Sequence, residues 1–424
     1  MTKTQSPAAF RASAEQALEA MRVLFPETPL QLNDHLSTRF GARVWLKRED
    51  LSPVRSYKIR GAFNFIRKAI ERDGGPALFV CASAGNHAQG FALVCRHFGR
   101  QGVVFMPVTT PKQKIEKTRM FGGDCIEIRL FGDIFDVCYG AAKDFAAAHG
   151  ALMAPPFDHD DIIEGQSTVA AEVMAQLPDG EIPDLVVMPV GGGGLSSGMT
   201  RYLDGIVAPQ AFVFVEPSGA PSLFETLSEG RRIRLDQVDN FVDGAAVAEI
   251  GARNFEILRR FPVGQVQLVH ENALCVTMTN MLNTEGIVLE PAGALALSAI
   301  EAMDRKAMVG KSIVAVVSGG NFDFERLPDV KERAMRHLGL KKYFILRLAQ
   351  RPGALKDLLA LFGPDDDIAR FEYLKKSARD FGSILIGIET RRPENFARLK
   401  AAFDAAGLRY QDITDNEIIA NLVI

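Results

Sequence analysis

The sequence predicts an α/β protein of two lobes followed by a smaller α+β module, and three observations lead to that prediction. Short apolar segments alternate with amphipathic ones from about residue 43 to about residue 320, an order typical of parallel sheets. Residues 185–190 are almost wholly apolar, as in strands that are buried on both faces. After about residue 340 the order becomes strand, helix, strand, strand, helix, which suggests a ferredoxin-like module.

Composition limits the classes of protein and partner. With 424 residues, the chain is long enough for two or three domains at about 150 residues each. A formal net charge of -3 gives no reason to expect attraction to nucleic acid or to an anionic membrane. The five cysteines are odd in number and show no C-x-x-C spacing, which argues against a disulfide framework or a zinc site. The first residues lack a signal-peptide core, and no stretch approaches about 18 apolar residues, so we expect a cytoplasmic protein.

The elements follow from periodicity and from turn residues. In the first part we expect helices over 13–24, 58–70, 88–98, 112–121 and 133–149, and strands over 30–32, 43–47, 78–81, 103–106 and 125–128. In the second part we expect helices over 161–177 and after 194, and strands over 185–190, 212–216, 266–269 and 313–317. A charged helix and linker over 326–339 lead to strands at 343–348, 368–374 and 383–389, with helices starting at 351 and spanning 394–406.

The stretch 47–62, K-R-E-D-L-S-P-V-R-S-Y-K-I-R-G-A, contains the candidate catalytic residue, Lys58. Lys58 precedes an apolar helical pattern, and positive charge is disfavoured at a helix N-terminus. Arg55 and Arg60 add cationic neighbours, and both effects favour the neutral amine that a nucleophilic lysine needs. Considered alone, Lys58 is as well explained as one solvated side chain among the 49 lysines and arginines.

Four consecutive glycines, Gly191, Gly192, Gly193 and Gly194, follow the predicted buried strand and precede a helix. Backbone N–H groups converge on an anion at such a turn, and only glycine permits the close approach that a phosphate requires. A plain strand-to-helix turn is the simpler alternative, although it rarely needs four glycines.

A dinucleotide site is the strongest rival interpretation of these glycines, because Glu216 ends the next strand about 20 residues on, where a ribose-binding acid would stand. The G-x-G-x-x-G pattern fails, however, since the position of its third glycine is Ser196 or Ser197. We therefore favour the phosphate of another cofactor.

A second strand-to-helix turn consists of Ser83, Ala84, Gly85, Asn86 and His87. Exposed amides there could hold a substrate carboxylate. The same residues also make a good N-cap and turn, and His87 is interpreted as structural. A third turn, S-G-G-N at 318–321, follows another predicted strand and allows the same two interpretations.

Taken in this order, the motifs resemble those of the pyridoxal-phosphate enzymes of the tryptophan-synthase-β superfamily, which have fold type II, and most closely those of threonine deaminases (threonine ammonia-lyases). The resemblance is carried by K-R-E-D-L-x-P-V-R-S-Y-K-I-R-G-A, S-A-G-N-H-A-Q-G, V-G-G-G-G-L, E-P-A-G-A and S-G-G-N, and it covers nearly the whole chain after about the first 25 residues. The later blocks R-P-G-A-L, G-P-D-D-D-I and F-E-Y-L-K-K resemble one copy of the ACT-like regulatory domain of the biosynthetic members.

The resemblance implies a cofactor, pyridoxal 5'-phosphate, held by Lys58 as a Schiff base. Its phosphate is expected on the glycine run and Leu195, its phenolic oxygen near the Asn86 amide, and its ring nitrogen at the hydroxyl of Ser318. Residues 83–87 are expected to bind the substrate carboxylate, and Lys58 to remove the α-proton. A neutral group at the ring nitrogen weakens the electron sink and suits β-elimination better than transamination.

The implied reaction is deamination of L-threonine to 2-oxobutanoate and ammonia, the first step of isoleucine synthesis from threonine. The resemblance also implies allosteric control by isoleucine or valine and a homotetramer. We expect a catalytic region over 1–330 with a smaller lobe at roughly 60–155, a linker over 331–340, and the regulatory domain over 341–424.

Two departures narrow the choice within the superfamily. Serine racemase relatives carry a serine where this chain has Ala84, so racemisation is not expected. Their cation-binding pattern E-P-x-x-A-x-D ends here in Ser222, so we expect no metal site. Glu290, in the block E-P-A-G-A, either lines the cleft or only opens a helix.

Three rival functions fit parts of the sequence. A catabolic serine/threonine lyase is the nearest, and a nicotinamide-dependent oxidoreductase follows from the dinucleotide interpretation. A non-catalytic amino-acid sensor is the third, and the presence of Lys58, Asn86 and Ser318 argues against it.

Overall fold

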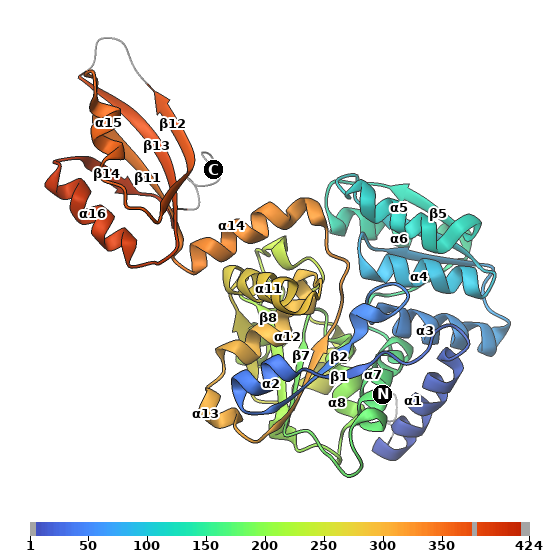
Figure 1. The fold of residues 1–424 in the computed structure, drawn as a ribbon. Helices are drawn as coiled ribbons and strands as arrows, with labels where there is room; N and C mark the ends of the chain where they lie inside the picture. The colour runs from blue at the N-terminus through green and yellow to red at the C-terminus, as the bar shows by residue number, and fades with distance from the viewer. Residues whose placement is uncertain (1–5, 375–379, 417–424) are drawn as a thin grey trace. The chain divides into compact units, whose positions relative to one another are not determined.

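The computed structural model describes residues 6–374 and 380–416, and the chain forms two compact units, Met1–Phe324 and Glu325–Ile424 (Figure 1). The first unit contains two parallel sheets with their helices, and the second contains one antiparallel sheet. Within the described residues, no helix has the length and apolar character needed to cross a membrane.

The larger lobe of the first unit is built on a six-stranded sheet. Its strands lie in the order β1 (Leu30–Leu32), β2 (Arg43–Arg48), β10 (Ser312–Val317), β7 (Leu185–Pro189), β8 (Phe212–Pro217) and β9 (Val266–Val269). Only the pairing of β1 with β2 is antiparallel; the other strands pair in parallel. Every residue of β10 is buried, so helices cover both faces of the sheet, as its apolar pattern predicts.

Nine α-helices accompany this sheet in the described part of the larger lobe. They are α1 (Pro7–Met21), α2 (Asp34–Phe40), α7 (Asp160–Gln176), α8 (Gly194–Tyr202), α9 (Ser222–Glu229), α10 (Ala252–Leu258), α11 (Glu271–Glu285), α12 (Pro291–Ala302) and α13 (Arg305–Met308). Ile163 of α7 and Leu195 of α8 join Val186 and Phe214 of the strands in one buried core. That core fixes the start of α8 against the end of β7.

The smaller lobe is a four-stranded parallel sheet with its own helices, shown in blue and teal in Figure 1. Its strands lie in the order β5 (Ile126–Leu130), β4 (Gln101–Met106), β3 (Leu78–Ala82) and β6 (Leu152–Met153). Its helices are α3 (Lys58–Asp73), α4 (Asn86–His97), α5 (Lys112–Gly122) and α6 (Phe135–His149). Phe63 and Ile66 of α3 pack with Phe91 of α4 and with Phe79 of β3, which fixes the first turn of α3.

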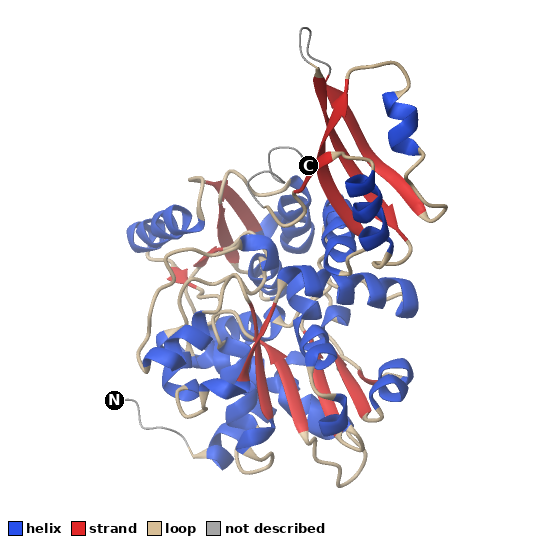
Figure 2. Cartoon of the chain, turned by 90° about the vertical axis from the view of Figure 1, so that its left-hand side faces the viewer, coloured by secondary structure: helices blue, strands red, loops and turns tan. Residues whose placement is uncertain are grey.

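The second unit begins with α14 (Leu327–His337) and continues as a sheet with two helices. In chain order it contains β11 (Lys341–Ala349), α15 (Ala354–Leu359), β12 (Asp366–Leu374), β13 (Phe381–Thr390), α16 (Asn395–Ala405) and β14 (Arg409–Asp412). The strands lie antiparallel in the order β12, β13, β11, β14, and both helices pack on one face, as Figure 2 shows. Phe344 and Ile386 meet Leu399 and Phe403 in the core between them.

Some expected boundaries were wrong. The first helix starts at Pro7 and not at residue 13, because Ser6 caps it by accepting a hydrogen bond from the Ala9 N–H. The helix expected from residue 88 starts at Asn86. The short polar strand β14 was not predicted from the sequence, nor were α2, α9 to α11, α13 and the extent of α12.

Candidate active site

Lys58 is the first residue of α3 and is half-buried. Its Nζ donates a hydrogen bond to the Pro156 carbonyl at 3.2 Å, and the ring centroids of Tyr57 and Phe157 lie 5.4 and 6.0 Å from it. Burial lowers the pKa of Lys58 to about 8, and the carboxyl of Glu290 opposes that shift. A neutral amine is therefore available in mildly alkaline solution.

The expectation that Arg60 helps to neutralise Lys58 was wrong, because two acids compensate the charge of Arg60. Its guanidinium lies 2.8 Å from Glu49 and 2.7 Å from Glu172, and Lys47 lies 2.6 Å from Glu172. All four side chains are fully buried. The network ties the first turn of α3 to β2 and α7, and removing one partner from such a buried set costs about 3–5 kcal/mol.

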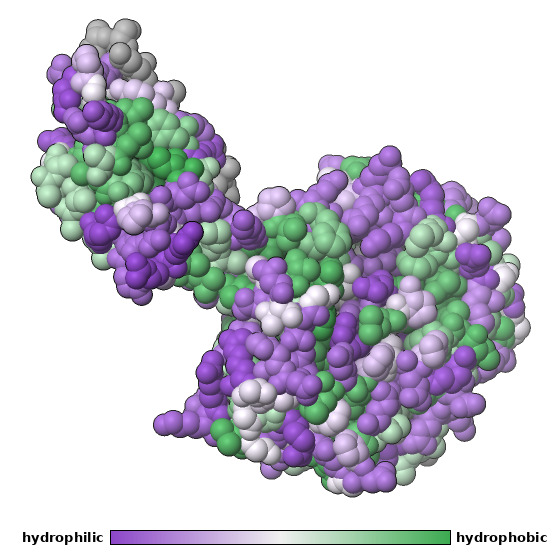
Figure 3. Space-filling view, in the orientation of Figure 1, coloured by the Kyte–Doolittle hydropathy of each residue, from purple (hydrophilic) through white to green (hydrophobic). Residues whose placement is uncertain are grey.

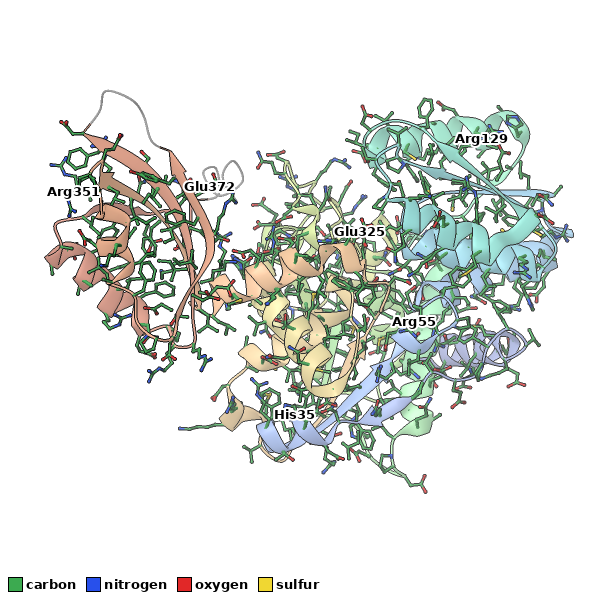
Figure 4. All side chains as sticks on the ribbon, turned by 45° about the horizontal axis from the view of Figure 1, so that its top comes forward. His35, Arg55, Arg129, Glu325, Arg351 and Glu372 are labelled. Carbon is green, nitrogen blue, oxygen red and sulfur yellow. The ribbon has the colours of Figure 1, made fainter. Side chains whose placement is uncertain are left out.

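The loop between β2 and α3 is joined to the turn that follows β10. Arg55, labelled in Figure 4, has a φ of 59°, a left-handed conformation uncommon outside glycine. The carbonyl of Arg55 accepts a hydrogen bond from the Gly320 N–H at 2.9 Å, and the Tyr57 N–H donates to the Ser318 carbonyl at 3.2 Å. Two of the predicted motifs, the lysine stretch and S-G-G-N, thus lie side by side.

The glycine run turns the end of β7 into the start of α8, as expected. Gly193 has a φ of 88°, and a Cβ placed on Gly192 would lie 2.3 Å from the Phe157 ring. Phe157 therefore touches the glycine run while its ring also faces Lys58. The first N–H groups of α8 have no acceptor within their own helix, so the turn presents donors to an anion.

A chain of amide and carboxyl groups crosses the site. The Asn86 Nδ2 donates to the Glu290 Oε1 at 2.6 Å, and the Asn321 Nδ2 donates to the Asn86 Oδ1 at 2.7 Å and to the Val54 carbonyl at 2.8 Å. One hydrogen of the Asn86 amide is used, and the second remains for a ligand. From the sequence, Glu290 was expected either to line the cleft or only to open a helix, and Asn321 was named only as part of the S-G-G-N turn, so neither was given a binding role.

The remaining predicted residues lie at the same edge. The Ser83 hydroxyl accepts a hydrogen bond from the Gly85 N–H at 3.2 Å, and Ala84 and Gly85 are half-buried in this turn. His87 is buried with its Nε2 3.1 Å from the Ala154 carbonyl, and burial lowers its pKa to about 4, which agrees with a structural role. The Ser318 hydroxyl donates to the Ala292 carbonyl at 3.2 Å.

The groups brought together fit pyridoxal phosphate. The cofactor needs an amine for its aldehyde, donors for its phosphate, and partners for its ring nitrogen and phenolic oxygen. Lys58, the helix start after the glycine run, Ser318 and Asn86 would supply these in that order. Any residue other than glycine at position 192 would place its Cβ within the Phe157 ring. The turn that would hold the phosphate therefore requires glycine at this position.

Two other expectations concern acidic residues. Glu216 is fully buried, and its carboxylate accepts hydrogen bonds from the N–H groups of Leu223 and Phe224 at 2.7 and 2.9 Å. The Glu216 side chain therefore binds the backbone N–H groups at the start of α9. In the described part of the chain, no three acidic, histidine or cysteine side chains gather where they could hold a metal ion.

The second unit carries a groove of about 610 Å³ at the start of α15. Apolar residues and two cations line it: Leu348, Pro352, Ala354, Leu355, Leu359, Arg351 and Lys356, together with Gln350, Gly353 and Tyr373. Figure 4 labels Arg351 at this helix start, and Figure 3 shows hydrophobic residues gathered on this unit among hydrophilic ones. Its two cations lie beside apolar residues and would attract an anionic group.

Comparison with known families gives two matches. Residues 21–319 match the family model described as pyridoxal-phosphate dependent enzyme. Residues 332–423 match the model described as the C-terminal regulatory domain of threonine dehydratase.

Curated relatives match over nearly the whole length. The biosynthetic L-threonine dehydratase IlvA of Halalkalibacterium halodurans is 41% identical over 409 residues, which are 96% of this chain and 97% of that protein. The enzyme of the same name from Bacillus subtilis is 41% identical over 398 residues, covering 94% and 93% of the two chains.

Solved structures with similar folds cover about three quarters of this chain. The processed form of threonine deaminase isoform 2 from Solanum lycopersicum has a TM-score of 0.70 and 35% identity, covering 76% of this chain and 93% of that chain. A second threonine deaminase, from the organism abbreviated T.th., has a TM-score of 0.67 and 31% identity, covering 74% and 98%.

Proposed function

Since the chain belongs to the pyridoxal-phosphate-dependent enzymes, in the branch with a threonine dehydratase regulatory domain, we propose that it is a threonine ammonia-lyase of isoleucine biosynthesis. It converts L-threonine to 2-oxobutanoate and ammonia. The strongest support is the similarity to a curated threonine dehydratase. That protein is 41% identical to this chain over 96% of its length, which includes both units.

Different residues of the site would bind different groups of the cofactor and of the substrate. Bound pyridoxal phosphate withdraws electrons from the α-carbon of the amino acid. Lys58 would hold it through Nζ, the glycine run and Leu195 would hold its phosphate, and Ser318 and Asn86 would meet its ring nitrogen and phenolic oxygen. The turn at 83–87 would bind the threonine carboxylate through backbone N–H groups.

Lys58 also moves the proton. Because burial lowers its pKa to about 8, the Lys58 Nζ can take the α-proton of threonine near neutral pH, and in the overall balance that proton and the β-hydroxyl make up the water that is lost. Ala84 offers no second acid or base beside this turn, so the proton is handled by Lys58 and racemisation is not favoured. The hydroxyl on the β-carbon leaves with a proton as water.

The overall balance of the reaction is simple. Loss of water across the Cα–Cβ bond leaves an enamine, and its hydrolysis takes up one water and releases ammonia and 2-oxobutanoate. No oxidant or reductant is consumed. A nicotinamide cofactor therefore has no role in this reaction, in agreement with the buried, backbone-bound Glu216.

Regulation is assigned to residues 341–424 and catalysis to 1–330, with 331–340 between them. The groove at the start of α15 combines Arg351 and Lys356 with apolar residues, which suits isoleucine or valine. An effector acts by binding one state better than another, typically with a coupling of about 1–3 kcal/mol. We also propose that the protein is a homotetramer and that it is located in the cytoplasm.

The test is the visible spectrum of the purified protein and of Lys58→Ala, before and after addition of L-threonine. We expect a cofactor band in the parent alone, and 2-oxobutanoate from the parent alone. Lys68→Ala, on the same helix, is the matched control and should retain both. A parent that stays colourless with added pyridoxal phosphate would exclude both lyase functions. The non-catalytic amino-acid sensor would then be the remaining interpretation.

The same assay separates the two lyases. The ratio of kcat/KM for L-threonine and L-serine should favour threonine. A preference for serine, with no response to isoleucine or valine, would make the protein the catabolic enzyme instead.

A further inference from the structure

Glu290 stands at a helix start but does not cap that helix. It is the residue before Pro291, where α12 begins, and its side chain makes no hydrogen bond to the α12 backbone. The short side chains of Ser, Thr, Asp and Asn ordinarily accept hydrogen bonds from the first turn of the helix at this position. The carboxylate of Glu290 instead lies 2.6 Å from the Asn86 Nδ2, across the cleft in the smaller lobe.

The backbone around Glu290 leaves room for this carboxylate. A Cβ placed on Gly319 would lie 2.0 Å from the Glu290 Oε1, and one on Gly293 would lie 2.0 Å from the Gly319 carbonyl oxygen. The same Cβ on Gly319 would lie 3.3 Å from the Arg55 carbonyl oxygen, so the bare backbone of Gly319 allows Glu290 to lie beside the lysine stretch. The side chain is only 6% exposed, so a carboxylate here needs a compensating partner.

Charged and titratable groups face Glu290 from each element packed around it. Asp243 raises its pKa, whereas Lys114 and the N–H donors of Asn86 and Asn321 lower it. Burial is the largest effect and brings the pKa of Glu290 to about 7. In return, its charge acts on Tyr57 and Lys58 of the lysine stretch and on Lys117 of α5.

We propose that Glu290 is a positioning residue of the active site, which orients the Asn86 amide through a hydrogen bond and, lying beside the lysine stretch, favours the ammonium form of Lys58 through its negative charge. The inference rests on the proposed function, since it concerns the same site. It gives Glu290 a role in setting the pH at which Lys58 becomes a neutral amine.

The experiment follows cofactor uptake by the cofactor-free full-length protein. Pyridoxal phosphate is mixed with the parent, Glu290→Gln, Glu290→Ala and Glu216→Gln, and the rate at which the visible band appears is recorded between about pH 6 and 10. Glutamine keeps the shape and an acceptor for Asn86 but lacks the charge. Glu216→Gln removes another buried carboxyl of the same lobe, away from the site.

If Glu290 favours the ammonium form of Lys58, Glu290→Gln moves the midpoint of the pH profile to lower pH by roughly one unit, because removing a nearby opposite charge lowers the pKa of an amine. Glu290→Ala should show the same shift and, because Asn86 loses its partner, a further uniform decrease in rate of about tenfold. Glu216→Gln should follow the parent.

Two results would overturn the inference. A Glu290→Gln profile that superimposes on that of the parent would show that Lys58 does not sense the carboxylate. A Glu290→Ala rate equal to that of Glu290→Gln would remove the orienting role. A parent that takes up no cofactor would instead refute the proposed function, so the two failures are distinguishable. Thermal unfolding of each variant separates these effects from simple loss of folding.

Discussion

At the scale of single residues, buried ionisable groups shape the chemistry of this protein more than exposed ones do. Lys58 and Glu290 lie in the site with pKa values displaced toward each other, to about 8 and about 7. Arg60, which we expected from the sequence to act on Lys58, instead holds the helix start in place through Glu49 and Glu172.

Glu216 gives a prediction for stability against pH. Burial raises its pKa to about 8 in the folded protein, from 4.5 in the unfolded chain. Between these values the folded state keeps a proton that the unfolded state has lost, so rising pH favours unfolding. The contribution of Glu216 to stability is therefore full below about pH 4.5 and lost as pH rises through about 8.

Glu216→Gln should remove this dependence. Measured by calorimetry between about pH 5 and 8, the Tm of the parent should fall relative to that of the variant as pH rises. The difference between the two proteins cancels the contributions of His87 and of the other titrating groups. A constant difference across this range would show that the Glu216 carboxyl is ionised in the folded state.

At the scale of elements, the site is assembled where strands end and helices begin. The ends of β3, β7 and β10 each lead into a motif that was predicted from the sequence. These motifs were predictable because glycine and small polar residues after an apolar run mark a turn, whatever the tertiary structure. Ser83, Gly191 and Ser318 are the first residues of such turns.

Residues that act only through tertiary contacts were not predictable in the same way. Glu290 and Asn321 gain their roles from Asn86, which lies more than 200 positions earlier in the chain. Pattern and propensity describe neighbours along the chain and contain no information on such a partner. The helix that Glu290 was considered to open is α12, whose residues 291–300 are all buried, so its sequence shows no amphipathic period from which its extent could be predicted.

The turn between β7 and α8 gives the second prediction. Gly192→Ala places a methyl group where the Phe157 ring lies, at 2.3 Å, so the turn or the ring must move. We expect the dissociation constant for pyridoxal phosphate to rise at least about tenfold, the consequence of losing one good backbone hydrogen bond. Titration of the cofactor-free protein, followed by absorbance, measures it.

Gly140→Ala is the matched control for that change. Gly140 lies within α6, and a Cβ there would meet nothing within 4 Å. Alanine should therefore leave cofactor binding unchanged and stabilise the helix by about 0.5–1 kcal/mol. Equal binding by the two variants would mean that the glycine run does not contact the phosphate.

At the scale of the whole molecule, the chain joins an α/β unit with two sheets to an α+β unit with one. The family matches and the related structures confirm the predicted fold class: a fold type II region with a regulatory domain after it. The alternation of apolar strands with helices was enough to predict the class, because the period of the pattern differs between the two kinds of element. Strand order was not predictable, since periodicity does not say which strands pair.

The second unit gives the prediction at this scale. Arg351 lines the groove and pairs with Asp357 across 2.6 Å. Arg351→Ala removes a cation that would bind the carboxylate of an amino-acid effector. The isoleucine or valine concentration needed for half of the effect should rise at least about tenfold, while kcat and KM without effector stay unchanged.

Arg409→Ala, an exposed arginine of β14 outside the groove, is the control for Arg351→Ala and should respond to effectors as the parent does. Steady-state rates with increasing isoleucine or valine measure both variants. An Arg351→Ala protein that keeps the response of the parent would place the effector elsewhere.

The pairing of β2 with β10 also determines the order in which the protein can fold while it is being synthesised. Arg43 to Arg48 leave the ribosome early, yet their parallel partner, Ser312 to Val317, is translated only after the small lobe and most of the larger lobe have been made. The small lobe can close on the nascent chain, because its four strands are contiguous in sequence. β2 must meanwhile wait with only β1 beside it and its other edge unpaired, a state in which aggregation competes with folding. A pause in translation before residue 317, or a shortage of chaperones, should therefore reduce the yield of active enzyme without any change in its sequence.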